Sequence, residues 1–242
     1  MYNRRSNNPF GGGGAFGSRY QYQTLPYGYE GAQSSGLIGK VMGLLAFSFI
    51  FATIGTFIGI SLQLGSGSSL ILAIGGLVIL IALNLLIQRS GINLFLLYLF
   101  TFVEGMSLSP LINFYLQFNA NILGQAFLIT AITSLALSFY AWTTKRDFTR
   151  LGDYLFVGVI ILLVAGLVNI FFQATFFALI ISVVGIAIFS GYVLFYVQRA
   201  KYMADTTPNA IGLTVSIFIT ILNLFLYILQ LLSILQGDNR RR

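Results

Sequence analysis

Few side chains in this sequence can do chemistry near neutral pH. The 242 residues include no cysteine and no histidine, which excludes thiol nucleophiles, Ser-His proteases and histidine proton relays and argues against zinc hydrolases. One ionisable side chain, Glu104, lies well inside an apolar stretch. A carboxylate within a membrane span is costly to ionise, so it is by default a candidate functional residue. We therefore expect that the protein is not an enzyme, that it binds no cofactor, and that its residue types define no metal site.

The neighbours of Glu104 in TFVEGMSLSPLI are small, polar or helix-breaking. Gly105 permits close backbone approach, and Pro110 lacks an amide donor, so we predict a kink there. The hydroxyls of Ser107 and Ser109 can donate to the carbonyls that such a kink frees. Two interpretations of Glu104 stay open: transient cation binding, or a protonated carboxyl group that hydrogen-bonds a neighbouring helix as packing.

A polar stripe runs along the last apolar segment. Its five residues recur at spacings of 4, 3, 4 and 3, which places them on one face of a helix. They are Ser216, Thr220, Asn223, Tyr227 and Gln230. Thr101 and Glu104 form a second, shorter stripe that could meet the first. The long stripe is either the wall of a polar pathway or a seam of interhelical hydrogen bonds.

Membrane-spanning helices are needed to position these residues. Hydrophobic residues make up 57% of the sequence and charged residues 8%, whereas soluble domains carry roughly 25% charged residues. A span needs about 20 apolar residues. We predict seven of them, at 41–64, 70–88, 91–117, 122–142, 154–172, 175–197 and 209–236. The expected fold is an all-α integral membrane protein, a bundle of seven transmembrane helices whose seventh is polar-striped.

The basic residues predict an orientation. With seven spans, 10 of the 13 lysines and arginines fall on the side of the N-terminus, and the loops of the other side carry none. Cytoplasmic loops are enriched in these residues, so we expect a cytoplasmic N-terminus. Arg240, Arg241 and Arg242 would then lie on the far side. The alternative is a last segment that breaks and turns back, which would return them to the cytoplasmic side.

The chain divides into a tail, a membrane domain and a short basic end. Residues 1–36 are rich in Gly, Asn, Tyr and Arg without apolar periodicity, so we expect a disordered cytoplasmic tail, either simply solvated or a handle for a partner. Residues 37–236 form the membrane domain, and 237–242 the C-terminal tail. The connection from Thr143 to Tyr154 carries Lys145, Arg146 and Arg150, which indicates either a headgroup anchor or a docking surface.

Three stretches together resemble the Bax inhibitor-1 family and, within it, the bacterial YccA-like branch. They are TFVEGMSLSPLINFYL from Thr101, TTKRDFTRLGDYLFVGVIILLVAGLVNIFFQ from Thr143, and TVSIFITILNLFLYILQLLSIL from Thr214. The resemblance implies six helices around a central seventh, a bacterial inner membrane location and a role in calcium leak and stress response. For the YccA-like branch it also implies interaction with an FtsH-type membrane AAA protease. Calcium-sensing members carry an aspartate pair, and the matching positions here are Val197 and Thr220, so that pH-gated latch is not expected.

Two functions follow as alternatives. The first is a leak pathway for calcium or other small cations along the polar stripe and past Glu104, with Thr101 and Ser107 beside it. The second is a non-catalytic modulator of a membrane AAA protease, which would use the N-terminal tail and cytoplasmic loops. The lipid bilayer is a partner in both, and nucleic acid in neither. The sequence does not define the oligomeric state.

Overall fold

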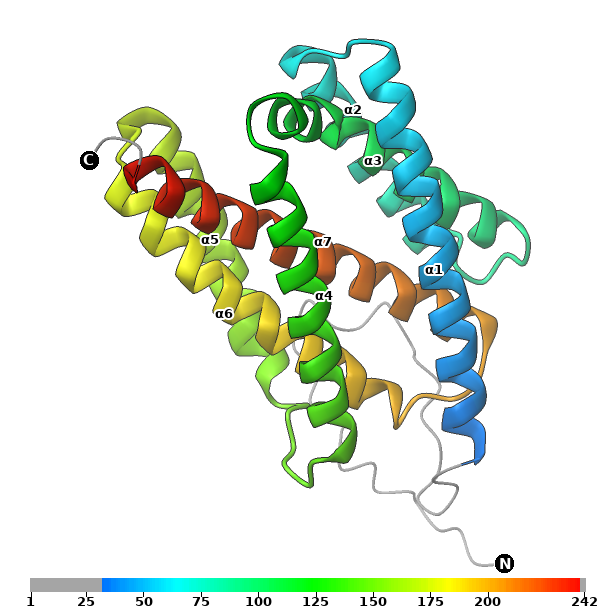
Figure 1. The fold of residues 1–242 in the computed structure, drawn as a ribbon. Helices are drawn as coiled ribbons and strands as arrows, with labels where there is room; N and C mark the ends of the chain where they lie inside the picture. The colour runs from blue at the N-terminus through cyan, green and yellow to red at the C-terminus, as the bar shows by residue number, and fades with distance from the viewer. Residues whose placement is uncertain (1–31, 240–242) are drawn as a thin grey trace, which may run out of the picture.

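The structure is a computed structural model that describes residues 32–239. Seven α-helices make up this part of the chain, without strands (Figure 1). They are α1 (Ala32–Ser61), α2 (Ser66–Leu85), α3 (Ile92–Phe118), α4 (Ala120–Thr143), α5 (Leu151–Phe172), α6 (Thr175–Ala200) and α7 (Thr207–Asn239). All seven are long and apolar enough to cross a membrane, which confirms the predicted fold class. The tail residues 1–31 and the arginines 240–242 lie outside the described residues.

The seventh helix runs through the middle of the bundle (Figure 1). It packs against α1, α3, α4 and α6. The ring around it is uneven, because α2 packs on α3 and α5 packs on α6, and both form the outer layer. Phe218 and Leu224 of α7 are completely buried. The central seventh helix is therefore as expected, with four close neighbours rather than six.

Helix α7 is continuous from Thr207 to Asn239. The alternative in which the last segment breaks and turns back is therefore wrong. Pro208 stands in the first turn, where its missing N–H interrupts no hydrogen bond. No further proline follows, and no glycine lies between Gly212 and Gly237. Because the helix does not break, its end at Asn239 lies at the opposite end of the bundle from the start of α1 (Figure 1).

The first helix begins earlier than the sequence predicts, at Ala32 rather than near residue 41. Its first turns are held by packing against the α6–α7 connection. Leu37 and Val41 are buried there against Met203 and Leu213. Burial of such side chains contributes about 1.5 to 3 kcal/mol each, which extends the helix beyond the apolar span.

Helices α1 and α3 approach each other through glycines. A Cβ atom on Gly105 would lie 1.9 Å from the carbonyl oxygen of Ala52, and one on Gly55 would lie 2.1 Å from that of Phe102. No larger side chain fits at either position without a backbone shift. Gly39, near the start of α1, has nothing within 4 Å of the same point. The close contact is therefore confined to the half of α1 that crosses α3.

Hydroxyl groups donate to three successive carbonyls of α3 beside Pro110. Ser109 Oγ donates to the Met106 carbonyl at 2.7 Å, the acceptor that Pro110 leaves without its usual N–H. Thr56 Oγ1 of α1 donates to the Gly105 carbonyl at 2.9 Å, and Ser69 Oγ of α2 donates to the Ser107 carbonyl. These bonds support a helix that stays continuous through the proline, while the kink itself stays a prediction.

The outer surface is apolar, as contact with lipid requires. Large side chains are exposed on every helix, up to Phe171 at 86%. Tyr and Trp gather near the end that carries the basic loops, where Trp142, Tyr154 and Tyr202 are at least 43% exposed. Such aromatic belts mark the interface between hydrocarbon and water. The helices therefore contact a lipid bilayer.

Candidate functional site

The polar side chains of α7 donate within their own helix. Ser216 Oγ donates to Gly212 O at 2.9 Å, Thr220 Oγ1 to Ser216 O at 2.7 Å, and Asn223 Nδ2 to Ile219 O at 2.8 Å. A hydroxyl that has committed its proton in this way offers only oxygen lone pairs to anything else. Ser216 and Thr220 therefore present acceptor oxygens on this face of α7, whereas the Asn223 amide keeps a second N–H that can donate.

Tyr227 lies further along the stripe, against α6. Its ring fills the space above Gly185, where a Cβ atom would come within 2.6 Å of it. It also stacks on Phe189, with the ring centroids 5.7 Å apart. The glycine makes room for the ring, so Tyr227 packs in the seam between α6 and α7.

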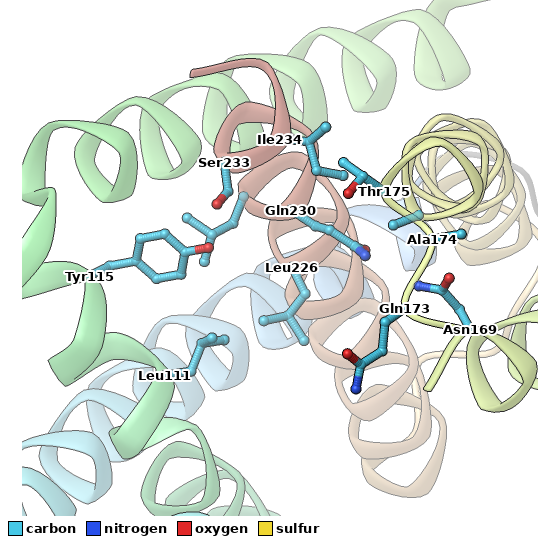
Figure 2. A pocket seen from close by; sticks show the side chains of 12 residues that line it. Leu111, Tyr115, Asn169, Gln173, Ala174, Thr175, Leu226, Gln230, Ser233 and Ile234 are labelled. Atoms are coloured by element: carbon cyan, nitrogen blue, oxygen red, sulfur yellow. The ribbon is translucent and has the colours of Figure 1, made fainter. Parts of the chain in front are cut away.

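Gln230, the last residue of the stripe, lines a cavity of about 500 Å³. The cavity lies between the C-terminal part of α7, the late turns of α3 and the α5–α6 turn (Figure 2). Its polar lining consists of six uncharged residues, Tyr115, Asn169, Gln173, Thr175, Gln230 and Ser233. In Figure 2 the Gln230 side chain extends from α7 toward the α5–α6 turn, and the Tyr115 hydroxyl approaches α7 from the other side. The cavity is at the end of the bundle whose connecting loops carry no basic residue.

Two amides of the cavity have unusual surroundings. Asn169 Oδ1 is buried without a hydrogen-bond donor, which is costly for a polar atom. Gln173 closes α5 in the left-handed conformation, with φ 48° and ψ 32°, a position that glycine normally occupies. The sequence contains a signal for both, since Asn169 and Gln173 are polar residues four apart at the end of an apolar run. Neither residue was predicted from the sequence to belong to a functional site.

Glu104 lies elsewhere in the bundle. Its Oε1 atom is 2.7 Å from the point where Gly76 of α2 would carry a Cβ, so the carboxyl group lies against α2. Thr101 is completely buried and donates to the Tyr98 carbonyl at 3.1 Å. Ser107 donates to the Glu104 carbonyl at 2.8 Å. None of these three residues lines the cavity that Gln230 enters, so the two polar stripes do not meet there.

The opposite end of the bundle is tied together by polar contacts. Lys40 of α1 forms an ion pair with Asp205 of the α6–α7 connection at 2.9 Å. Lys201 donates to the Ala141 carbonyl at 2.8 Å and to the Trp142 carbonyl, where burial lowers the pKa of its ammonium group. A cation at the last carbonyls of α4 is favourable because the helix dipole is negative there.

Gln198 adds a further tie at the same end. It is buried, donates to the Arg146 carbonyl and accepts from the Phe148 N–H. Val197 precedes it on α6 and is half-buried, whereas Thr220 is buried on α7. The two positions matched to the family aspartates thus hold uncharged side chains. These contacts link α1, the α4–α5 loop and the α6–α7 connection at the basic end.

Comparison with known proteins agrees with this architecture. The family model described as "Inhibitor of apoptosis-promoting Bax1" (Bax1-I) matches residues 34–237. An uncharacterized protein of Campylobacter jejuni is 35% identical over 223 residues, covering 88% of this chain and 94% of that protein. The Golgi anti-apoptotic protein of vaccinia virus is 31% identical over 202 residues, covering 81% and 84%. Protein lifeguard 4 of Mus musculus is 31% identical over 163 residues, covering 67% of each chain.

The match of the family model spans all seven helices and the loops between them. The relatives named above come from a bacterium, a virus and a mammal. The chain is an integral membrane protein that belongs to the Bax inhibitor-1 family.

Proposed function

We propose that this protein is a leak pathway for small cations that serves ion homeostasis and stress response. The observation that carries the proposal is that the last residue of the α7 stripe lines the cavity. Gln230 belongs to both, and Ser216 and Thr220 present acceptor oxygens because their hydroxyl protons are bonded within α7. Oxygens of this kind replace the hydration shell of a cation and do not stabilise an anion.

The charge distribution supports entry from the cavity end. The connecting loops near the cavity carry no basic side chain, so they do not repel a cation. Arg240, Arg241 and Arg242 follow the end of α7 in the sequence and lie outside the described residues. The basic end is closed by Lys201, Gln198 and the pair of Lys40 with Asp205. We propose that this conformation is closed at the basic end and open at the cavity. Conduction would require the α6–α7 connection to move.

Ion flux from liposomes tests the proposal. Purified protein is reconstituted, and the release of trapped calcium and potassium is followed with fluorescent indicators at several pH values. We expect Gln230→Leu to lower the flux at least about tenfold, because losing one oxygen ligand worth about 1.4 kcal/mol raises the barrier by that amount. Gln117→Leu is the matched control, because it makes the same change at an exposed position of α3 that does not line the cavity, and it should leave the flux unchanged. Flux no higher than in protein-free liposomes, or an unchanged flux in Gln230→Leu, would refute the proposal.

Orientation is part of the proposal, and we infer a cytoplasmic N-terminus in a bacterial inner membrane. The basic loops support it through the positive-inside rule. Because the chain has no cysteine, single cysteines at Gln63 and Lys145 can be labelled without background. An impermeant maleimide added to intact spheroplasts should label the cysteine at position 63 and not that at 145. The reverse pattern would overturn the orientation.

A second candidate function is modulation of a membrane AAA protease. The observation in its favour is the exposure of Lys145, Arg146 and Arg150 on the α4–α5 connection, on the side proposed to be cytoplasmic. The tail that would add to this surface lies outside the described residues. Deleting residues 1–31 should abolish co-purification with the protease while the bundle stays folded. Unchanged co-purification would remove the tail from this role.

A further inference from the structure

We infer that the ion this pathway carries is monovalent and weakly hydrated, of the potassium type, and that calcium is a poor substrate. The inference rests on the proposed leak function and names its substrate class. Every residue that lines the cavity is uncharged. Neutral amide and hydroxyl oxygens therefore have to provide the coordination that an ion receives on entering.

The charge of the ion decides whether neutral oxygens suffice. The cost of removing an ion from water rises with the square of its charge, so a divalent ion loses about four times as much as a monovalent ion of equal size. Protein calcium sites offset this cost with carboxylates, and their affinity follows the number of ligand charges. Potassium pathways are built from neutral carbonyl oxygens alone. The side-chain amides of Asn169, Gln173 and Gln230 offer neutral carbonyl oxygens, like the ligands of potassium pathways.

The carboxylates whose side chains the structure describes are all engaged elsewhere or remote from the cavity. Glu104 lies against α2, and Asp205 is paired with Lys40. Asp147 accepts hydrogen bonds from Thr149 in the α4–α5 loop. Asp153 is in the first turn of α5, at the basic end. Within the described residues no group of three acidic, histidine or cysteine side chains is placed to hold a metal ion.

The surroundings of these amides are explained better by ion binding than by side-chain packing. Asn169 Oδ1 is buried next to the cavity and has no hydrogen-bond donor. A small rotation of the side chain would let this oxygen coordinate an ion in the cavity. Gln173 keeps a left-handed backbone at which a non-glycine residue is strained. The glutamine would supply a second carbonyl oxygen on the same wall.

The test compares potassium, sodium and calcium flux in the same liposomes, with a carboxylate introduced into the cavity. We expect potassium flux to exceed calcium flux at least tenfold. Gln230→Glu and Asn169→Asp should each raise calcium flux relative to potassium flux at least tenfold, because a carboxylate offsets the divalent dehydration cost. Gln117→Glu is the matched control: it introduces the same charge at an exposed position of α3 that does not line the cavity. It should leave the ratio unchanged.

The outcomes distinguish this inference from the leak function on which it rests. No flux of any ion would overturn the leak function and the inference together. Calcium flux equal to or above potassium flux would overturn the inference alone. A calcium-to-potassium ratio that changes no more in Gln230→Glu and Asn169→Asp than in Gln117→Glu would also overturn it. Asp238 lies outside the described side chains, so each measurement is repeated in an Asp238→Asn background, where the same ratios should hold.

Discussion

Replacing Gly105 by alanine tests the contact on which the α1–α3 pair depends. The added methyl group would lie 1.9 Å from the Ala52 carbonyl oxygen and 2.7 Å from the Ala52 Cα. Both partners are backbone atoms of a packed helix, so no side-chain rotation relieves the clash. The two helices have to separate by more than about 1 Å before the methyl group reaches van der Waals distance.

The expected cost has two parts. Overpacking a well-packed site typically costs about 1 to 3 kcal/mol. Separation of the helices also breaks the bond from Thr56 Oγ1 to the Gly105 carbonyl, which contributes about 0.6 kcal/mol on the scale measured inside membranes. Alanine is favoured over glycine in a helix by about 0.5 to 1 kcal/mol, which offsets part of this. We expect a net loss of about 1 to 3 kcal/mol.

Unfolding of the purified protein in mixed detergent micelles measures this loss, with the fraction of SDS as denaturant and far-UV circular dichroism as readout. Gly39→Ala is the matched control, because nothing lies within 4 Å of its added methyl group. It should be neutral or stabilising by up to about 1 kcal/mol. If Gly105→Ala proves as stable as Gly39→Ala, the helices are not in the close contact described, and the reasoning fails.

Two further predictions concern single side chains. Ser109→Ala should lower stability by about 1 kcal/mol in the same SDS titration, because a buried carbonyl loses its donor. Adding Pro110→Ala to it restores a backbone N–H and should recover most of that loss; a double variant no more stable than the single one would contradict this account. Gln173→Gly should stabilise the protein by about 1 to 2 kcal/mol because it relieves the left-handed backbone. It should also lower potassium flux, and unchanged flux would show that this glutamine supplies no ligand.

Much of the fold could be predicted from the sequence because the membrane leaves few choices. Backbone groups in hydrocarbon must be hydrogen-bonded within the segment, so an apolar run of sufficient length becomes a helix whatever surrounds it. The seven predicted spans are confirmed, and so is the role of Ser109 beside Pro110, which depends on contacts within one helix. The polar face of α7 was likewise predicted from the spacing of its polar residues alone.

The relative rotation of the helices was decided only by the tertiary structure. Lipid tails and the bundle interior are both apolar, so the hydrophobic pattern does not distinguish the lipid-facing side of a helix from its buried side. Sequence reasoning could therefore place Glu104 inside the membrane but not choose between α2 and α7 as its neighbour. The cavity depends on the same choice, since Asn169 and Gln230 are 61 positions apart and meet only because α5, α6 and α7 pack in one orientation. Spacing along one helix defined the polar stripe, and packing between helices decided which part of it lines the cavity.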